Sequence, residues 1–273
     1  MRKIITLITT AAMAWSLAAC SVSDSNGHKP FGVFLGASGE DAEKMTEYEV
    51  VVIEPETFDR EQIDVLHDAG CFVYGYLDIG TLEVYRDYYE LFEDEALAVY
   101  DDWPDERWMD CSSADWQGYI TDVLAPSYLE LGLDGFFLDN CDVYYMYPSD
   151  DMFYGMVGIL RGLDEYDVKL MVNGGNDFVM RCVDEGISSG LIDAICQETV
   201  FTSIDFDNRT YGEQPVDESL YYQEYVESAS EAGIEVYLIE YAAEGDVLER
   251  AEDYCEEWGF ILYNAAGLEL VCE

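Results

Sequence analysis

The stretch that indicates the fold of this chain is Leu131-Gly132-Leu133-Asp134-Gly135-Phe136-Phe137-Leu138-Asp139-Asn140-Cys141-Asp142. A glycine-punctuated turn leads into four apolar residues, and the run then ends abruptly in acids. A short apolar run bounded by turn signals predicts a strand buried on both faces. Packing does not explain an acid at the carboxyl end of such a strand, and in α/β folds ligands bind at that edge. We therefore interpret Asp139 as a catalytic carboxylate.

Similar short apolar runs occur along the rest of the chain, with helical patterns between them. The eight expected strands are Phe31–Leu35, Val50–Ile53, Cys71–Leu77, Gly135–Leu138, Val168–Val172, Leu191–Gln197, Ile234–Ile239 and Phe260–Tyr263. Short apolar strands that alternate with helices are typical of a parallel sheet. Eight of them over about 240 residues predict a closed (β/α)8 barrel, the TIM-barrel fold, as a single domain over residues 31–273.

Three segments between the strands carry their own expectations. Asp59, with Gln62 three residues later, predicts a capped helix start. Residues 112–130 are expected to form a helix that Pro126 bends. The acidic and aromatic segment Thr81–Cys111 has no periodic pattern, so we expect a decorating loop with helical pieces that lines the site.

The N-terminus has the pattern of a targeting segment rather than of a folded element. Arg2 and Lys3 precede an apolar run that ends in Leu-Ala-Ala-Cys20, which predicts a secretory signal over residues 1–19. This ending resembles a bacterial lipobox, which implies lipidation of Cys20 and anchoring on the outer face of the cytoplasmic membrane. Residues 20–30 would then be a polar tether. The alternative is an ordinary signal peptide that is cut nearby.

The formal net charge of −47 limits the possible partners. A strongly acidic protein is repelled by nucleic acid and by anionic lipid surfaces, which excludes both as expected partners. A cationic polymer would be attracted. The alternative explanation is solubility or a salty habitat, and acidic runs such as Glu93-Asp94-Glu95 are expected to be solvated faces.

The cysteine and histidine content argues against a metal site. Seven cysteines follow Cys20, so at least one is unpaired, and the spacing does not define any disulfide. The chain has no CxxC pair and only two histidines, so a zinc site is not expected. We expect a monomer that needs neither a metal nor an organic cofactor.

Polar residues close the expected strands, and in a barrel all of them would converge on the same rim. They are Glu54, Asp78, Asp139, Asn173, Glu198, Glu240 and Asn264. Asp139 and Glu198 end strands that are two apart, so at about 4.8 Å per neighbouring strand their carboxylates should lie roughly 5–9 Å from each other. Two carboxylates at that separation can flank a glycosidic bond.

Glycosidic cleavage requires one protonated and one ionised carboxyl group. Glu198 has apolar neighbours that could raise its pKa, whereas Asp139 lies in a more polar stretch. We therefore assign Glu198 as acid/base and Asp139 as nucleophile. The alternatives are a turn or capping role for Asp139 and a salt bridge for Glu198, with Glu240 as a rival catalytic residue or a hydrogen-bonding partner of the substrate.

Aromatic residues near the expected site are candidates for stacking on sugar rings, with ordinary packing as the alternative. They are Trp103, Trp108, Tyr144, Tyr145 and Tyr147.

Several motifs, taken in order, resemble glycoside hydrolase family 114, the endo-α-1,4-polygalactosaminidase-like (β/α)8 barrels. They are Tyr74-Gly-Tyr-Leu-Asp-Ile-Gly80, Trp108-Met-Asp-Cys-Ser-Ser-Ala-Asp-Trp116, Asp134-Gly-Phe-Phe-Leu-Asp139, Val172-Asn-Gly-Gly175 and Gln197-Glu-Thr-Val-Phe201. The resemblance covers roughly residues 31–265.

The resemblance implies a catalytic pair formed by Asp139 and Glu198. It also implies an active-site lining that contains Tyr76, Asp78, Asp110 and Asn173. The implied reaction is cleavage of α-1,4-linked galactosamine polymers, which are cationic when deacetylated and would therefore be attracted by the acidic protein. Two alternatives stay open. One is a non-catalytic surface lipoprotein that binds carbohydrate or a polycation, and the other is a barrel hydrolase that acts on a neutral α-glycan.

Overall fold

The computed structural model describes residues 27–206 and 208–272, and an eight-stranded parallel sheet forms its centre. The strands follow the order β1 (Lys29–Phe34), β2 (Tyr48–Ile53), β3 (Phe72–Asp78), β7 (Gly135–Asp139), β8 (Lys169–Asn173), β9 (Ala194–Glu198), β12 (Glu235–Tyr241) and β13 (Ile261–Ala265). The edge strands β1 and β13 also contact each other, so the sheet nearly closes into a barrel. The expected (β/α)8 fold and its eight strands are confirmed.

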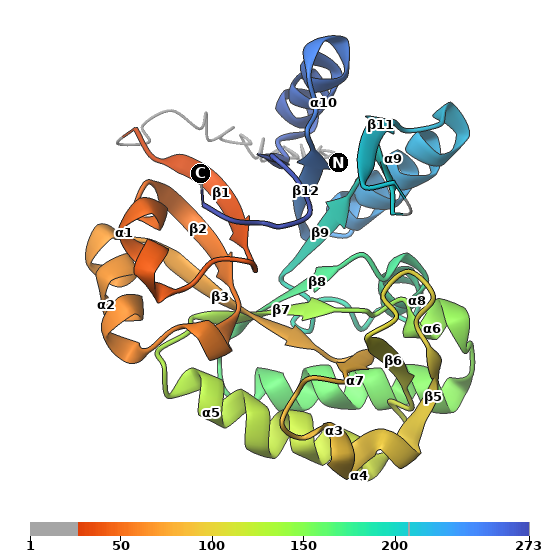
Figure 1. Ribbon diagram of the computed structural model, residues 1–273. Helices are drawn as coiled ribbons and strands as arrows, with labels where there is room; N and C mark the ends of the chain where they lie inside the picture. The colour runs from red at the N-terminus through yellow and green to blue at the C-terminus, as the bar shows by residue number, and fades with distance from the viewer. Residues whose placement is uncertain (1–26, 207, 273) are drawn as a thin grey trace, which may run out of the picture.

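Helices surround the strands on the outside of the barrel (Figure 1). They are α1 (Ala42–Met45), α2 (Arg60–Ala69), α4 (Ala114–Tyr119), α5 (Ala125–Leu129), α6 (Val143–Met146), α7 (Asp150–Asp164), α8 (Asn176–Asp184), α9 (Val216–Glu231) and α10 (Gly245–Trp258). The predicted cap of α2 is confirmed, because the backbone N–H of Gln62 donates to Asp59 and the Gln62 side chain accepts from the Asp59 N–H.

Pro126 changes the helix over residues 112–130 more than a simple bend would. A π-helical turn, Ile120–Leu124, separates α4 from α5. Proline has no N–H to donate to the carbonyl four residues earlier, and the wider turn accommodates this gap in the hydrogen-bond ladder.

Alternate residues of each barrel strand point to opposite sides. One set fills the barrel interior and includes Tyr74 and Tyr76 of β3 and Tyr237, Ile239 and Tyr241 of β12. The other set packs against the helices. Because both faces are buried, the strands appear in the sequence as continuous apolar runs.

Segment Thr81–Cys111 is not mainly a loop, which corrects the expectation from its sequence. It forms a three-stranded antiparallel sheet of β4 (Thr81–Glu83), β6 (Glu106–Met109) and β5 (Ala96–Val99), together with α3 (Tyr89–Phe92). Strands of three or four residues are too short to give a recognisable alternation. We call this segment the inserted sheet. A second antiparallel pair, β10 (Thr202–Asp205) and β11 (Thr210–Glu213), follows β9.

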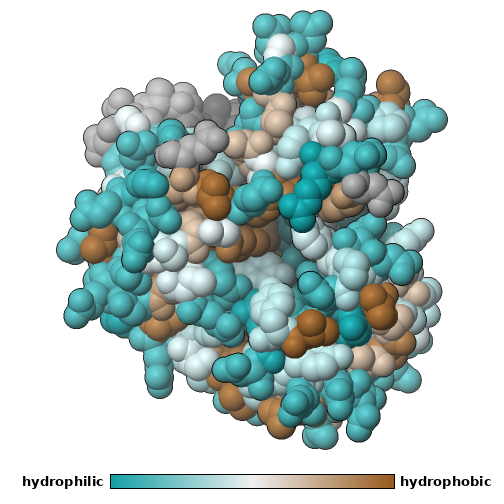
Figure 2. All heavy atoms as spheres, in the orientation of Figure 1, coloured by the Kyte–Doolittle hydropathy of each residue, from teal (hydrophilic) through white to brown (hydrophobic). Residues whose placement is uncertain are grey.

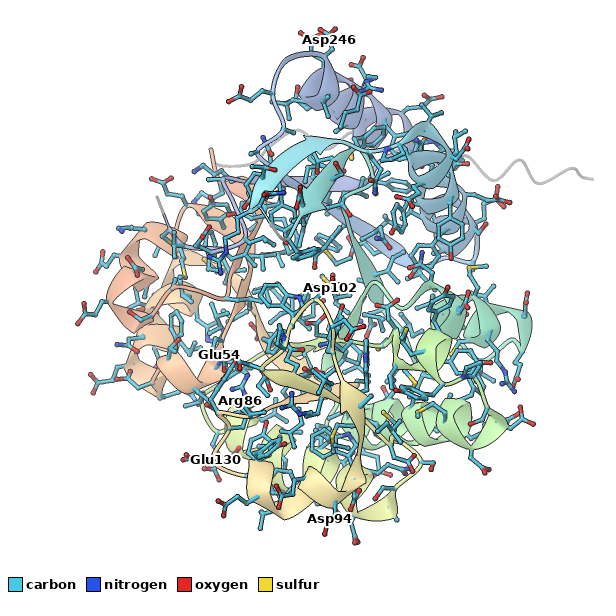
Figure 3. The ribbon with its side chains drawn as sticks, turned by 45° about the vertical axis from the view of Figure 1, so that its right-hand side comes forward. Glu54, Arg86, Asp94, Asp102, Glu130 and Asp246 are labelled. Atoms are coloured by element: carbon cyan, nitrogen blue, oxygen red, sulfur yellow. The ribbon has the colours of Figure 1, made fainter. Side chains whose placement is uncertain are left out.

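Arg86 fastens the inserted sheet to the barrel. Its guanidinium is 4% exposed and forms ion pairs with Glu54 at 2.9 Å and Glu83 at 2.7 Å. Figure 3 shows Arg86 beside Glu54, whereas the labelled acids Asp94, Glu130 and Asp246 lie at the periphery. Glu54 therefore has a structural partner at the barrel rim.

Replacing Arg86 by methionine is expected to lower the free energy of unfolding by about 3–5 kcal/mol, because buried carboxylates would lose their only buried cationic partner among the described residues. Urea-induced unfolding followed by circular dichroism measures this loss. Arg60→Met is the matched control, because Arg60 forms an exposed pair with Asp64 that contributes at most about 1 kcal/mol. Equal losses for the two variants would contradict the anchoring role.

The predicted signal peptide, the lipidated Cys20 and most of the tether lie outside the described residues. Within the described ranges, none of the helices has the length and apolar character needed to cross a bilayer.

Candidate active site

The structure brings Asp139 and Glu198 together at the carboxyl ends of β7 and β9, with Asn173 of β8 between them. The Asn173 amide nitrogen donates to Oδ1 of Asp139 at 2.9 Å and to Oε1 of Glu198 at 2.8 Å. The two hydrogens of an amide point about 120° apart, so the two carboxylate oxygens lie roughly 5 Å from each other. Asp139 and Glu198 are both partly exposed and therefore accessible to a ligand.

A tyrosine from the adjacent strand holds each carboxylate on its other oxygen. The Tyr76 hydroxyl donates to Oδ2 of Asp139 at 3.0 Å, and the Tyr241 hydroxyl donates to Oε2 of Glu198 at 2.5 Å. Burial raises the pKa of both tyrosines well above the ordinary value, so both remain protonated donors. Tyr241 was not foreseen from the sequence, although it lies on the inward-facing side of β12.

The surroundings of the two acids favour different protonation states. Burial raises the pKa of Glu198, and the hydrogen bonds from Tyr241 and Asn173 act against this increase. Burial also raises the pKa of Asp139, but Asn173, the Asn140 backbone and Tyr76 all lower it again. Because more donors face Asp139, its ionised form is the better stabilised of the two.

A cavity of about 460 Å³ lies beside Asp142, three residues after Asp139. The residues that line it are Ala98, Val99, Tyr100, Asp101, Asp102, Trp108, Asp142, Met146 and Tyr147. Tyr100 and Trp108 pack with ring centroids 4.3 Å apart. Burial raises the pKa of Asp142 to about 6. Figure 2 shows a mostly hydrophilic face that is hollowed near its middle.

Two glycines allow the loop after β8 to approach this region. Gly174 and Gly175 have φ values of 58° and 64°. A Cβ on Gly175 would come within 2.5 Å of the Cβ of Cys141, so only glycine fits there. The Gly175 N–H donates to Asp142 at 3.3 Å.

The other aromatic candidates are distributed differently. Trp108 and Tyr147 line the cavity. Trp103 contacts Phe206, and Tyr144 packs against Phe153 and accepts a hydrogen bond from Arg181. Tyr145 is largely exposed.

Glu240 corrects one expectation from the sequence. It is fully buried, and its carboxylate accepts hydrogen bonds from the backbone N–H groups of Phe201 and Thr202 at 2.9 and 2.7 Å. It fixes the segment after β9, and this burial is incompatible with contact to a substrate. Its burial and its backbone partners disfavour both roles that the sequence suggested for Glu240.

Asp78 and Asp110 have intramolecular partners instead of an open position in the cavity. Asp78 is 6% exposed and accepts hydrogen bonds from the backbone of Gly80 and Thr81. These contacts disfavour its expected contact with a ligand. Asp110 accepts from the backbone and hydroxyl of Ser112, in the turn before α4.

The described part of the chain also shows the state of the cysteines and of possible metal ligands. Its seven cysteines are free, and six of them are buried. Across residues 27–206 and 208–272 there is no group of three or more histidine, cysteine, aspartate or glutamate residues arranged to hold a metal ion.

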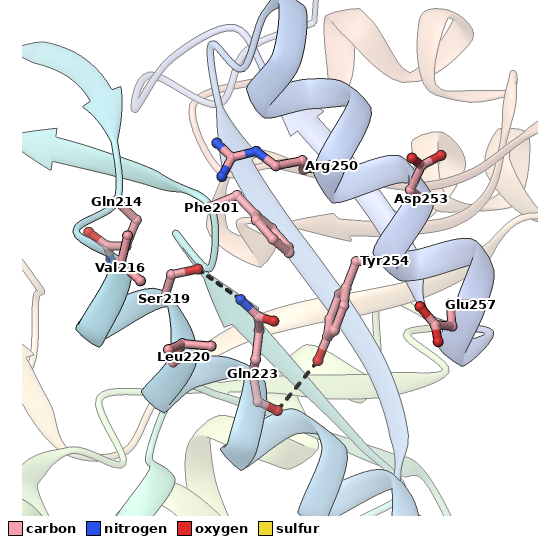
Figure 4. Close-up of a pocket in the computed structure, with 10 residues that line it drawn as sticks. All are labelled: Phe201, Gln214, Val216, Ser219, Leu220, Gln223, Arg250, Asp253, Tyr254 and Glu257. Carbon is pink, nitrogen blue, oxygen red and sulfur yellow. Dashed lines mark hydrogen bonds between the residues drawn. The ribbon is translucent and has the colours of Figure 1, made fainter.

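A second cavity, of about 390 Å³, lies between α9 and α10 (Figure 4). Its lining includes Arg250, Asp253 and Tyr254, and none of the residues predicted for the site. Neither Asp139 nor Glu198 lines it.

Comparisons with known proteins bear on the family and the fold. The model of glycoside-hydrolase family GH114 matches residues 16–263. The glycoside hydrolase domain of PelA from Pseudomonas aeruginosa is similar at a TM-score of 0.74 and 16% identity, over 88% of this chain and 95% of that one. Ega3 from Aspergillus fumigatus, solved with galactosamine, is similar at a TM-score of 0.70 and 17% identity, over 90% and 94%. No curated protein matches the chain. At these identities the structural likeness shows the fold alone.

Proposed function

Because this chain belongs to glycoside-hydrolase family GH114 and is therefore a glycoside hydrolase, we propose that it cleaves α-1,4-linked galactosamine-type polysaccharide with Asp139 and Glu198. The match over residues 16–263 confirms the family resemblance carried by the motifs. Family membership also disfavours a purely non-catalytic binding protein.

The observation that carries the proposal is the single Asn173 amide that donates to both carboxylates. A separation of roughly 5 Å is typical of retaining glycosidases, whereas inverting enzymes leave about 6.5–9.5 Å for a water molecule. In the proposed reaction Asp139 attacks the anomeric carbon while Glu198 protonates the departing oxygen. Glu198 then removes a proton from the water that hydrolyses the glycosyl-enzyme.

Charge and cavity chemistry support an amino-sugar substrate. The chain carries a net charge of −47, and Asp101, Asp102 and Asp142 line the 460 Å³ cavity, in which Asp142 follows Asp139 by three residues. Carboxylates attract the ammonium group of a deacetylated sugar. The partly exposed Tyr100 ring, which packs on the buried Trp108, offers an apolar face for the sugar ring. A neutral α-glycan would not benefit from these charges.

The test is incubation of the purified protein with deacetylated and acetylated α-1,4-galactosaminoglycan and with a neutral α-1,4-glucan. Product mass analysis identifies the cleaved polymer, and NMR of the first products gives the anomeric configuration. We expect shorter galactosamine oligomers whose new ends keep the α configuration. Cleavage of the glucan alone would overturn the substrate assignment, and β products would overturn the retaining mechanism.

Tyr241→Phe is expected to lower kcat about tenfold, because Glu198 loses the donor that fixes its orientation. That hydrogen bond lowers the pKa of Glu198. Its removal should therefore raise this pKa and move the part of the alkaline limb that Glu198 causes to higher pH. Tyr237→Phe, on the same strand and the same face, is the control. An unchanged profile for Tyr241→Phe would contradict this role.

We also propose that the domain is anchored outside the cytoplasmic membrane through a lipid on Cys20, and that it acts there as a monomer. The support is the Leu-Ala-Ala-Cys sequence after a basic and apolar N-terminus. Labelled palmitate should be incorporated into the wild-type chain and not into Cys20→Ala. Equal labelling of both would exclude this anchor.

A further inference from the structure

A hydrogen-bonded chain of buried side chains links the inserted sheet to the nucleophile. The Thr81 hydroxyl contacts both Asp78 and Glu106, with 2.7 Å to Oε2 of Glu106. The Asn140 amide nitrogen lies 3.0 Å from Oδ2 of Asp78, 3.1 Å from the Thr81 hydroxyl and 3.5 Å from Oδ2 of Asp139. Glu106 thus reaches the neighbourhood of Asp139 through two side chains.

Counting hydrogens shows that this chain needs an extra proton. A hydroxyl has one hydrogen to donate, and an ionised carboxylate can only accept. If Asp78 and Glu106 were both ionised, one of the two contacts of Thr81 would join two oxygens with no hydrogen between them. One of the two carboxyl groups is therefore protonated.

The distribution of donors shows which one holds the proton. Asp78 accepts hydrogen bonds from the backbone N–H groups of Gly80 and Thr81 and from Asn140. Besides the Thr81 contact, Glu106 has only the longer approach of Asn140, at 3.4 Å. Burial raises the pKa of Asp78 as well as that of Glu106, so the two carboxyl groups compete for one proton. Because donors stabilise an ionised carboxylate and Asp78 has more of them, we take Asp78 as the anion. Glu106 donates to Thr81, and Thr81 donates to Asp78.

We propose that Glu106 is a positioning residue for the hydrolysis: in its protonated form it completes the Glu106–Thr81–Asp78 chain that orients Asn140 beside Asp139. This inference rests on the proposed role of Asp139 as nucleophile. Asn140 directly follows Asp139 and has a φ of 58°, an unusual conformation for a residue other than glycine that its side-chain partners must stabilise.

The electrostatic surroundings set the pH at which this chain is complete. Burial raises the pKa of Glu106 to about 7. The charged groups that face Glu106 are the carboxylates of Asp78, Glu83 and Asp139 and the guanidinium of Arg86, and the phenols of Tyr76, Tyr85 and Tyr100 also lie nearby. A raised pKa means that Glu106 is protonated below about pH 7 and ionised above it. The chain therefore breaks as the pH rises through that value.

The first test compares pH profiles of kcat. The side-chain amide introduced by Glu106→Gln can donate to Thr81 at any pH, so this variant should keep wild-type turnover at pH 6 within about threefold and lose less activity above pH 7. Its alkaline limb should begin at higher pH, where the ionisation of Glu198 rather than that of Glu106 lowers kcat. Asp105→Asn, at the exposed neighbouring position, should follow the wild-type profile. A Glu106→Gln profile that superimposes on the wild type would overturn the proposal.

Thr81→Val provides a second variant in case Glu106→Gln does not fold. It keeps the shape of the side chain and removes the hydroxyl that joins the two acids. We expect kcat at pH 6 to fall about tenfold. The decrease in kcat that the wild type shows near pH 7 should be missing. Wild-type turnover and profile in this variant would overturn the proposal.

Infrared spectroscopy of the resting enzyme tests the proton without any substrate. At pH 6 the wild-type spectrum should contain a carbonyl stretch of a protonated carboxyl group that disappears near pH 7. Glu106→Gln should lack this band while it keeps the bands of the other protonated carboxyl groups, such as Glu198 and Asp142. Absence of this band would overturn the positioning role even if the enzyme cleaves galactosamine polymers. If the band is present but the protein cleaves none of the polymers, Glu106 is protonated as proposed, and the proposed substrate is refuted instead.

Discussion

Replacing Asp139 by asparagine is expected to lower kcat by about 10⁴-fold or more on every substrate, because an amide cannot form the glycosyl-enzyme. The variant should still fold. Asp139 accepts hydrogen bonds from Asn173, from Tyr76 and from the Asn140 backbone, and an asparagine retains only one acceptor oxygen. We therefore expect a loss of about 1–3 kcal/mol in unfolding free energy. Initial rates and thermal unfolding measure the two effects separately.

Asp142→Asn is the matched control for Asp139. Asp142 lies three residues further along the same loop and lines the cavity, so its loss should raise KM for a cationic polymer more than it lowers kcat. The reverse outcome, with Asp139→Asn active and Asp142→Asn inactive, would move the nucleophile to Asp142.

The alternation of side chains along the strands explains which site residues could be predicted from the sequence. Asp139, Asn173 and Glu198 are the last polar residues of their strands. Each lies two residues after an interior residue of the same strand, so its side chain faces inward. In β12 the interior residues are Tyr237, Ile239 and Tyr241, and Glu240 therefore faces the helices. Taking the last polar residue of a strand therefore finds the inward-facing residue in β7, β8 and β9 and misses it in β12, because an offset of one residue reverses the face.

The inserted sheet could not be predicted from sequence patterns, for a different reason. Its strands have three or four residues each, and its position depends on the buried ion pairs of Arg86. Glu106 gave no signal in the sequence, since it is one acid among 59 acidic residues. Only the pairing of β4 with β6, which joins segments more than twenty residues apart, brings it next to Thr81.

Glu198→Gln is expected to lower kcat on polysaccharide by about 10³-fold, because the departing sugar hydroxyl needs a proton that glutamine cannot supply. The size of this loss should depend on the leaving group. An aryl glycoside with an acidic phenol departs without protonation, so glycosyl-enzyme formation should remain near the wild-type rate, and added azide should accelerate its breakdown. Asp139→Asn should show neither effect, since it cannot form the intermediate.

This contrast between the two variants decides the assignment of roles. Both carboxylates receive a donor from Asn173 and another from a tyrosine, so the geometry is nearly symmetric between them. What differs is the additional donation to Asp139 from the backbone of Asn140, which favours its ionised form. If azide instead rescued Asp139→Asn and left Glu198→Gln inactive on the aryl glycoside, the two residues would have exchanged roles. The extra donor would then be too weak to control which carboxyl group keeps its proton.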